Sequence, residues 1–503
     1  MGNTHSLDIT GTLTEDLAEN LAKINAIMGK NNEMIQREII IGGKYGQTAC
    51  FLYLDGLIDK RTISDFILKP LQNIAVDEEK ITLENISKSF ISTVEIEEAA
   101  ELKVIINRLI NGFTVLLLEG NAEALLIETR GWEKRSITEP STEVVVRGPR
   151  EGFVENLQTN IALLRRKLKH PDFTLERFVV GRYTQTNVAV VYLRSLADPN
   201  VVKEVKKRIE KIDIDGIFES GYIEQLIEDN PYSVFATVGN SEKPDKVAAK
   251  MLEGRVAIMV DGSPIVLTVP LLFVETMQSS EDYYSRPYYA AFVRLIRYIS
   301  LFVSVWGPGI YVAIICFHQE LLPYELSLTI STADINTPFN AVLGIFILGI
   351  IYEILREAGV RLPRPAGEAV SIVGALVIGQ TAVAAGIISA PVVIVVAGTA
   401  IASFVTNPLT DSGTMYRIIF LILAGVLGGF GILIGSMFFF GHLLSLKSFG
   451  VPYLAPILPT YSLRDTIVRF PLWMLDKRPT YLATSGSKHR QAKNQKPAKE
   501  AKT

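Results

Sequence analysis

The distribution of apolar residues divides this chain into parts with different solvent requirements. Residues 1–286 have the mixed polar and charged composition of a water-soluble protein, whereas residues 298–446 contain long apolar runs with almost no charge. Residues 447–503 are polar again and end in a lysine-rich tail. Long uncharged runs are typical of membrane-spanning helices. The chain is therefore predicted to join a large soluble half to a half embedded in a membrane, which favours gating, transport or signalling.

Four apolar runs are long enough to cross a bilayer as helices, given a rise of ~1.5 Å per residue. A fifth run, residues 392–406, is shorter and follows a turn at residues 389–391, so it either spans the membrane or is re-entrant. The four longer runs are residues 298–317, 339–355, 369–388 and 418–446.

The placement of lysine and arginine predicts the orientation. Arg286, Arg294 and Arg297 precede the first run, and residues 318–338 contain no lysine or arginine. Basic residues collect on the cytoplasmic side of membrane proteins, so both ends of the chain are expected in the cytoplasm. That arrangement requires an even number of crossings, with which five full spans conflict. Residues 1–20 lack the basic start and apolar core of a secretory signal.

The soluble half reads as mixed α/β in two subdomains, because short β-like runs alternate with amphipathic helical patterns. The predicted fold class is thus α+β with membrane helices: two cytoplasmic α/β subdomains followed by a polytopic α-helical transmembrane domain. The predicted divisions are an N-terminal tail (1–33), a first α/β subdomain (34–130), a connector (131–152), a second α/β subdomain (153–285), a transmembrane domain (286–446), a cytoplasmic segment (447–480) and a basic disordered tail (481–503).

Catalytic and ligand-binding motifs are absent from the sequence. No phosphate-binding loop and no dinucleotide fingerprint occurs, and the five histidines are scattered outside any metal-ligand spacing. Cys50 and Cys316 are interpreted as plain buried thiols. The chain is predicted not to be an enzyme, to need no metal or cofactor, and not to bind nucleic acid.

Two features of the apolar half are candidate sites. In the third run, Val373, Val377, Gln380, Ala384 and Ile388 repeat with helical spacing on one stripe. A stripe of small and neutral residues can line a pore between subunits, or it can pack against the glycines of the last run. We expect the stripe to line a pore.

A second feature is an acid near the end of the second run. Glu353 lies one turn before Arg356, and an interfacial acid paired with arginine is the interpretation we favour. The apolar half contains no chain of buried acids of the kind that a proton-driven transporter uses.

Several segments resemble one family closely. They are residues 139–155 (EPSTEVVVRGPREGFVE), 181–183, 252–264 (LEGRVAIMVDGSP), 278–284 (QSSEDYY), 353–363 (EILREAGVRLP), 373–380 (VGALVIGQ) and 448–452 (SFGVP). They are similar to the A subunits of bacterial spore germinant receptors, the GerA family, across residues 39–475. Where many members carry an acid after the glycine, this chain has Gln380, so no charged pore residue is inferred.

The resemblance implies a multi-pass protein of the spore inner membrane with its soluble domain in the cytoplasm. It implies two partners, a transporter-like B subunit that recognises the germinant and a lipoprotein C subunit. It also implies a homo-oligomeric ion channel that opens when nutrient binds the partner. Alternatives are a SpoVAF-type relative, which assists germination without sensing nutrient, and a secondary transporter of the nutrient itself.

Two further predictions concern chain segments. The connector contains Arg147, Gly148, Pro149 and Arg150, in which proline restricts φ and glycine frees it, and it is predicted to transmit force between the subdomains. Residues 488–502 combine lysine with glutamine, alanine and proline, which predicts disorder and an attraction to anionic membrane lipid.

Overall fold

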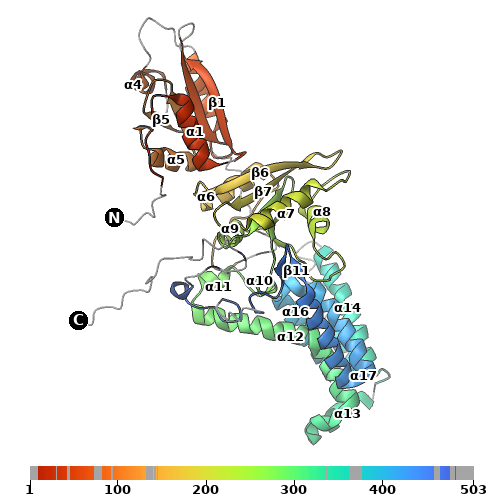
Figure 1. Cartoon of the computed structure of the whole chain (residues 1–503). Coiled ribbons are helices and arrows are strands. Elements are labelled where there is room, and N and C mark those ends of the chain that lie inside the picture. The colour runs from red at the N-terminus through yellow and green to blue at the C-terminus, as the bar shows by residue number, and fades with distance from the viewer. Residues whose placement is uncertain are drawn as a thin grey trace, which may run out of the picture. The chain divides into compact units, whose positions relative to one another are not determined.

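A computed structural model divides the chain into two compact units (Figure 1). The α/β unit comprises Met1–Asp229, Val238–Pro270 and Asp476–Gln495, and the helical unit comprises Asn230–Thr237, Leu271–Leu475 and Lys496–Thr503. The structure describes residues 9–29, 31–41, 46–72, 82–91, 95–131, 140, 143, 145–335, 337–361, 377–457, 465–475, 478 and 482. The predicted basic tail (481–503) therefore lies outside the described residues, except for Leu482.

The first subdomain of the α/β unit is an antiparallel sheet in the order β1-β2-β4-β5-β3. Helices α1 (Leu17–Met28) and α5 (Leu102–Ile110) cover one face, where Ile24, Met28 and Ile105 are completely buried. The strands are β1 (Met34–Ile41), β2 (Gln47–Leu54), β3 (Ile96–Ala99), β4 (Phe113–Leu118) and β5 (Ala124–Glu128).

Short helical segments cover the opposite face of this sheet. Ile67, Leu71 and Ile86 from these segments are fully buried against Phe51 and Leu116 of the sheet. The segments are α2 (Lys60–Thr62), η2 (Ile63–Leu68), α3 (Lys69–Gln72), α4 (Leu83–Asn85) and η3 (Ile86–Phe90).

The second subdomain repeats this design. Its sheet has the order β6-β7-β9-β10-β8, which is the order of the first sheet with every strand renumbered by five. Strands β2 and β7 also share the same burial pattern, in which four consecutive residues are buried. The elements are α6 (Leu157–Lys167), β6 (Phe173–Val180), β7 (Thr186–Leu193), α7 (Pro199–Glu210), α8 (Ser220–Ile227), β8 (Gly239–Ser241), α9 (Pro244–Leu252), β9 (Val256–Val260) and β10 (Val266–Val269).

The repeat extends to the start of each subdomain's first helix. Asn20 of α1 donates its side-chain N–H to the carbonyl of Thr14 (2.6 Å), and Asn160 of α6 donates to the carbonyl of Val154 (2.5 Å). In each case the asparagine oxygen accepts the backbone N–H of the same residue, at 2.8 Å. The α/β unit therefore contains an internal structural repeat, which sequence analysis missed.

A buried charge pair joins the two subdomains. The Glu33 carboxylate, just before β1, lies 3.0 Å from the Arg165 guanidinium of α6, and both side chains are fully buried. Burial raises the pKa of Glu33 and lowers the pKa of Arg165, and their mutual attraction opposes both shifts. Removing either side chain would leave the other charge buried alone, so the contact between the two subdomains depends on both residues.

Two predicted boundaries are wrong. The N-terminal segment 1–33 is not a tail, because α1 inserts Leu17, Ile24 and Met28 into the first core. The second subdomain does not extend to residue 285, because the helical unit begins at Leu271 and also includes Asn230–Thr237. The predicted mixed α/β character of the first half is confirmed.

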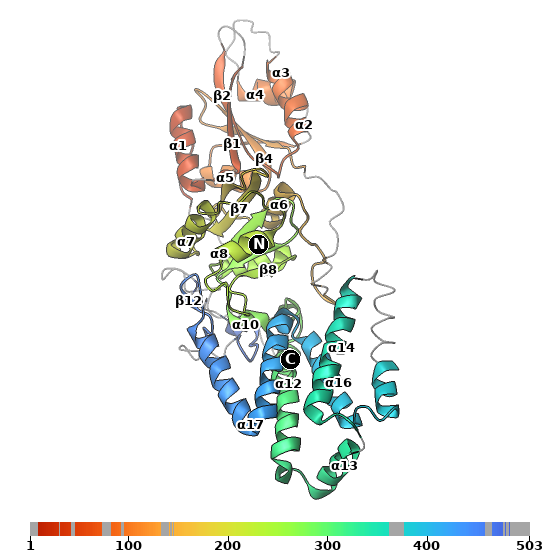
Figure 2. The same ribbon diagram turned by 90° about the vertical axis from the view of Figure 1, so that its right-hand side faces the viewer.

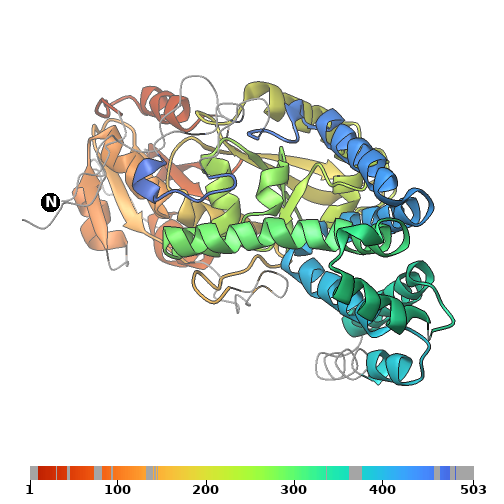
Figure 3. The same cartoon turned by 90° about the horizontal axis from the view of Figure 1, so that it is seen from below.

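The helical unit is built around long apolar helices. Among the described residues, two helical stretches are long and apolar enough to cross a membrane, namely α12 (Pro287–Phe317), which Figure 3 shows as a single long helix, and Asn407–Ser445. The other elements are α10 (Phe273–Thr276), α11 (Glu281–Tyr284), η4 (Gln319–Leu321), α13 (Tyr324–Ile335), α14 (Ala341–Arg361), α16 (Ala390–Val405), η5 (Asn407–Leu409), α17 (Thr410–Ser445), β11 (Lys447–Ser448), β12 (Val451–Pro452) and η6 (Leu472–Met474).

Helix α17 is a hairpin, not the single span predicted for residues 418–446. Gly428 has a positive φ of 60° and interrupts the helical backbone. The rings of Tyr416 and Phe439 lie 4.8 Å apart, although in a straight helix they would be separated by about 35 Å. The halves, residues 410–427 and 429–445, are therefore antiparallel (Figure 2).

Candidate functional site

Three residues of the predicted pore stripe lie in residues 377–384, the described part of a helix. Val377, Gln380 and Ala384 are all exposed, and Val377 retains 51% of its accessible surface. Val373 lies outside the described residues. An exposed row of this kind is available to a neighbouring chain, and its role in lining a pore stays a prediction.

Ile388 does not belong to this stripe, which corrects the prediction. The helix ends at Ala384, and Gly386 turns the chain with a positive φ of 65°. Ile388 is consequently buried beside Ile345 and Val392. The run 369–388 is therefore not one continuous helix to its end, because the chain bends before α16 begins.

The predicted connector is fastened to the second subdomain. Glu143 accepts a hydrogen bond from the Ser241 hydroxyl (2.5 Å) and is ion-paired with Lys246. Burial opposes ionisation of Glu143, but the attraction of Lys246 outweighs it and lowers its pKa. Gly148 follows with a positive φ of 144°.

The rest of the connector motif has no regular secondary structure. Arg147 and Arg150 are exposed and Pro149 is half-buried. The transmission of force by this motif stays a prediction.

An ion-pair cluster holds the start of α12. Arg294, fully buried, contacts Asp282 of α11 (3.2 Å) and Asp465 (3.3 Å), and Arg297 contacts the same Asp282 (2.8 Å). Asp465 lies beyond the last apolar run, and its backbone carbonyl also accepts a hydrogen bond from Arg294 (2.9 Å). The cluster thus ties the segment after the helical hairpin to the first long helix.

The segment Asn230–Thr237 is inserted into the helical unit. Phe235 is 3% exposed and stacks on Tyr416 (ring centroids 5.6 Å apart) and against Phe439 (5.8 Å), so it contacts both halves of α17. Ser233 is hydrogen-bonded to His442 of the second half (3.0 Å). Both ends of this segment continue along the chain into the α/β unit.

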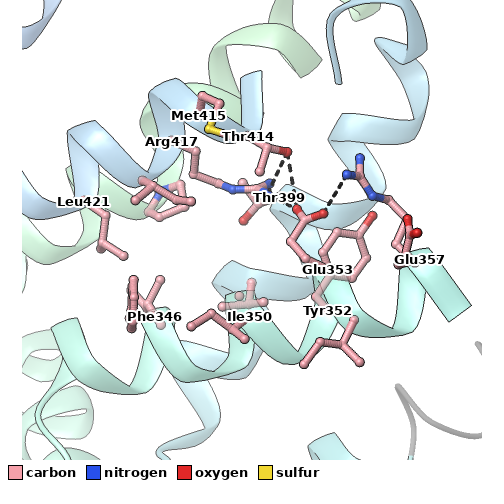
Figure 4. Close-up of a pocket in the computed structure, with 17 residues that line it drawn as sticks. Phe346, Ile350, Tyr352, Glu353, Glu357, Thr399, Thr414, Met415, Arg417 and Leu421 are labelled. Atoms are coloured by element: carbon pink, nitrogen blue, oxygen red, sulfur yellow. Dashed lines mark hydrogen bonds and ion pairs between the residues drawn. The ribbon is translucent and has the colours of Figure 1, made fainter. Parts of the chain in front are cut away.

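A cavity of about 550 Å³ lies between α14 and the first half of α17 (Figure 4). Its wall is largely apolar, and a charged cluster occupies one side. The Glu353 carboxylate binds Arg417 through one oxygen (2.6 Å) and Arg356 through the other (2.8 Å). The predicted pairing of Glu353 with Arg356 is confirmed, whereas Arg417 was not anticipated.

Sequence reasoning missed Phe235 and Arg417 for different reasons. Residues 234–238 (VFATV) read as a strand of the second subdomain, so the sequence does not predict that Phe235 packs in the helical unit. Arg417 directly precedes the apolar run at residue 418, and a lone arginine beside an apolar run was a usable signal. In the described ranges, no cluster of three or more His, Cys, Asp or Glu residues could hold a metal ion.

The chain combines an α/β unit with a helical unit whose long apolar helices are suited to a membrane. This combination is typical of a membrane protein with a large soluble domain. Residues 22–481 match the family described as Bacillus/Clostridium GerA spore germination protein, and the chain belongs to this family. The resemblance found in the sequence is thereby confirmed.

Individual relatives match along most of their length. The chain is 44% identical to Spore germination protein KA of Bacillus subtilis, covering 96% of this chain and 90% of that protein. It is 36% identical to Spore germination protein A1 of the same species (91% and 94%). It is also 41% identical to the Uncharacterized membrane protein YfkQ of that species (95% and 93%).

Among solved structures, the N-terminal domain of the A subunit of the Bacillus megaterium spore germinant receptor GerK3 aligns with 52% of this chain and 98% of that chain. The sequence identity is 32% and the TM-score is 0.40.

Proposed function

We propose that this chain is the A subunit of a spore germinant receptor and forms a homo-oligomeric, germinant-gated ion channel. It would act with a transporter-like B subunit and a lipoprotein C subunit in the spore inner membrane, coupling nutrient recognition to ion release. The observation that carries the proposal is the family match over residues 22–481, together with relatives named as spore germination proteins.

The hairpin in α17 supports a polytopic arrangement with six crossings. These are α12, α14, the run 369–388, α16 and the two halves of α17. At ~1.5 Å per residue, each half of α17 is about 26 Å long, close to the ~30 Å hydrocarbon layer. Six crossings return the chain to the side from which it started, which removes the conflict between five spans and two cytoplasmic ends.

Side-chain contacts fit this order of crossings. At one end of the bundle Tyr352 of α14 is hydrogen-bonded to Ser403 of α16 (3.3 Å). At the other end, the hairpin tip at Gly428 lies against Phe317, the last residue of α12. The first end carries the Glu353 cluster with its arginines, so the positive-inside tendency assigns it to the cytoplasm.

The segment around Phe235 offers a route for coupling. Because Asn230–Thr237 is covalently continuous with the α/β unit at both ends, a displacement of that unit would pull on Phe235. Phe235 contacts both halves of α17, so the pull would change their packing. Two packings of one helical hairpin would then correspond to closed and open states.

The pore is assigned to the exposed row Val377, Gln380 and Ala384, with subunits of the oligomer arranged around it. An apolar ring can block ions by dewetting, and Gln380 would add one neutral polar ring. The competing account packs this row on the glycines of the last run. Gly431 and Gly435 instead face Leu423 and Phe420 of their own hairpin, which favours the pore.

A second candidate function is that of a SpoVAF-type relative that assists germination without sensing nutrient. A secondary transporter is less favoured, because such proteins usually carry repeated broken helices around a mid-membrane site.

Deleting the gene separates these functions. A receptor subunit predicts loss of the response to one class of nutrient, with normal responses to the others, measured by cation release and by the fall in optical density of spores. An accessory relative predicts a uniform slowing with every nutrient. Copurification of tagged protein with B-type and C-type subunits would support the receptor, and normal germination with all nutrients would contradict both.

A further inference from the structure

The cavity between α14 and α17 is not used by the proposed gating route. Its lining is dominated by apolar side chains such as Phe346, Ile350 and Leu421 (Figure 4). At about 550 Å³ it falls within the ~300–1,000 Å³ of small-molecule pockets. Gly349 lies in its wall, and a Cβ added there would meet no atom within 4 Å. Among the described residues, this helix face is therefore open at Gly349.

Charged groups at the edge of the cavity are two arginines, Arg356 and Arg417, and two glutamates, Glu353 and Glu357. Arg356 and Arg417 share the carboxylate of Glu353, and Arg361 is bound to Glu357 (2.6 Å). Arg361 does not line the cavity, so the formal charges of the lining balance, and any preference for an anion rests on the position of Arg356. The Arg356 side chain is 28% exposed, so it remains accessible to an acceptor from outside the chain.

We propose that this cavity binds one acyl chain of an anionic phospholipid from the cytoplasmic leaflet, with the head group at Arg356. The apolar wall matches an acyl chain, and a guanidinium binds phosphate through directed hydrogen bonds. This inference rests on the proposed membrane topology, which places the Glu353 end of the bundle on the cytoplasmic side. An exposed arginine between helices on that side is suited to an anionic head group.

The bound lipid would connect the two helices that border the cavity. Arg356 belongs to α14, whereas Leu421 and Arg417 belong to the first half of α17, the same half that contacts Phe235 through Tyr416. A chain that fills the space between them would favour the arrangement of α17 in which the cavity exists. Anionic lipid would therefore act as a ligand of one state of the hairpin.

Native mass spectrometry of the purified full-length protein tests the proposal, with phosphatidylglycerol, palmitate or phosphatidylcholine added. Gly349→Leu fills the cavity, and Gly359→Leu on the same helix is the matched control, because a Cβ at Gly359 also meets no atom within 4 Å and Gly359 does not line the cavity. Arg356→Gln removes the head-group contact, with Arg361→Gln as its control.

The proposal predicts that wild-type protein and Gly359→Leu retain one phosphatidylglycerol more strongly than phosphatidylcholine. Gly349→Leu should lower phosphatidylglycerol binding by about tenfold, equivalent to about 1.4 kcal/mol. Arg356→Gln should abolish the preference over phosphatidylcholine, and Arg361→Gln should keep it. Palmitate binding as strong as that of phosphatidylglycerol would assign the site to a free fatty acid and overturn the phospholipid.

Crosslinking with a photoactivatable phosphatidylglycerol needs only the wild-type protein, so its result does not depend on whether the variants fold. Adducts within residues 345–357 and 414–421 of the wild-type protein support the proposal, and adducts confined to other helices overturn it. Unchanged lipid binding in Gly349→Leu with a smaller oligomer would assign the cavity to a second copy of the chain. None of these readouts uses germination, so they are independent of the receptor assignment.

Discussion

Gly431 lies against the backbone carbonyl of Leu423, in the opposite half of the α17 hairpin. A Cβ at Gly431 would come within 2.1 Å of the Leu423 oxygen, a distance that no side chain can accept. Residues that are eight apart on a continuous helix cannot touch, since they are separated by about 12 Å along its axis. The contact therefore exists only because the chain reverses at Gly428.

Substituting Gly431 by alanine is expected to destabilise the helical unit by about 1–3 kcal/mol, because the added methyl group overpacks the hairpin. Gly441→Ala is the matched control in the same half, where a Cβ meets no atom within 4 Å. Thermal unfolding of the two purified variants in detergent measures the difference. Equal melting temperatures would indicate that α17 is one straight helix.

Removal of the Phe235 ring is expected to uncouple the two units. Phe235→Ala leaves a void among Tyr416, Phe439 and Tyr453, and such truncations cost about 3–5 kcal/mol in a packed core. Spores carrying this variant should accumulate the protein, at reduced levels, and should germinate far more slowly per molecule.

Tyr232→Ala is the control for this experiment, because Tyr232 is fully exposed in the same segment. It should leave both abundance and germination unchanged. Immunoblots of spore membranes, combined with nutrient-triggered loss of optical density, separate lost protein from lost coupling. Phe235→Ala spores that germinate at the normal rate per molecule would exclude Phe235 from the coupling route.

Glu224 of α8 makes the stability of the α/β unit sensitive to pH. Burial, followed by repulsion from Glu228 and Glu219, raises the pKa of Glu224 to about 7. A raised folded-state pKa means that the protonated form is favoured on folding, so this stabilisation is present below the ordinary value of 4.5 and is lost as pH rises through about 7.

The melting temperature of the full-length protein should consequently fall between about pH 5 and about pH 8. Glu224→Gln should reduce this fall, whereas Glu210→Gln, an exposed substitution on α7, should not alter it. Identical pH profiles for wild type and Glu224→Gln would show that Glu224 titrates normally.

The sequence carried enough information for the elements with strong periodicity. The short apolar runs of β2 and β7 and the long apolar run of α12 indicate buried strands and a buried or membrane helix, because burial on both faces or all round imposes those patterns. The reversal at Gly428 was not recognised, since a glycine within an apolar run serves close helix packing as readily as a break. The internal repeat was missed because backbone geometry is shared while most side chains differ.

The candidate site was less accessible to sequence reasoning than the fold. The pairing of Glu353 with Arg356 follows from their spacing of three residues on one helix. Arg417 and Phe235 reach their partners only through tertiary packing of segments far apart in the chain. Ile388 was placed on the wrong face because helical spacing was extended past Gly386, where the backbone turns.

The central claim is that exposed residues of the third apolar run line an ion path. Val377→Ser replaces an apolar group by a hydroxyl and should ease wetting of the constriction. Ile394→Ser is the control, because Ile394 of α16 is 71% exposed and lies outside the proposed stripe. Both variants should be present in spore membranes at wild-type levels.

The most direct measurement is the potassium and sodium content of dormant spores, followed over time without nutrient. Spores with Val377→Ser are expected to lose these cations and to germinate spontaneously, while wild-type and Ile394→Ser spores retain them. Val377→Ser spores that contain normal amounts of the protein, stay dormant and keep their cations would contradict the pore assignment.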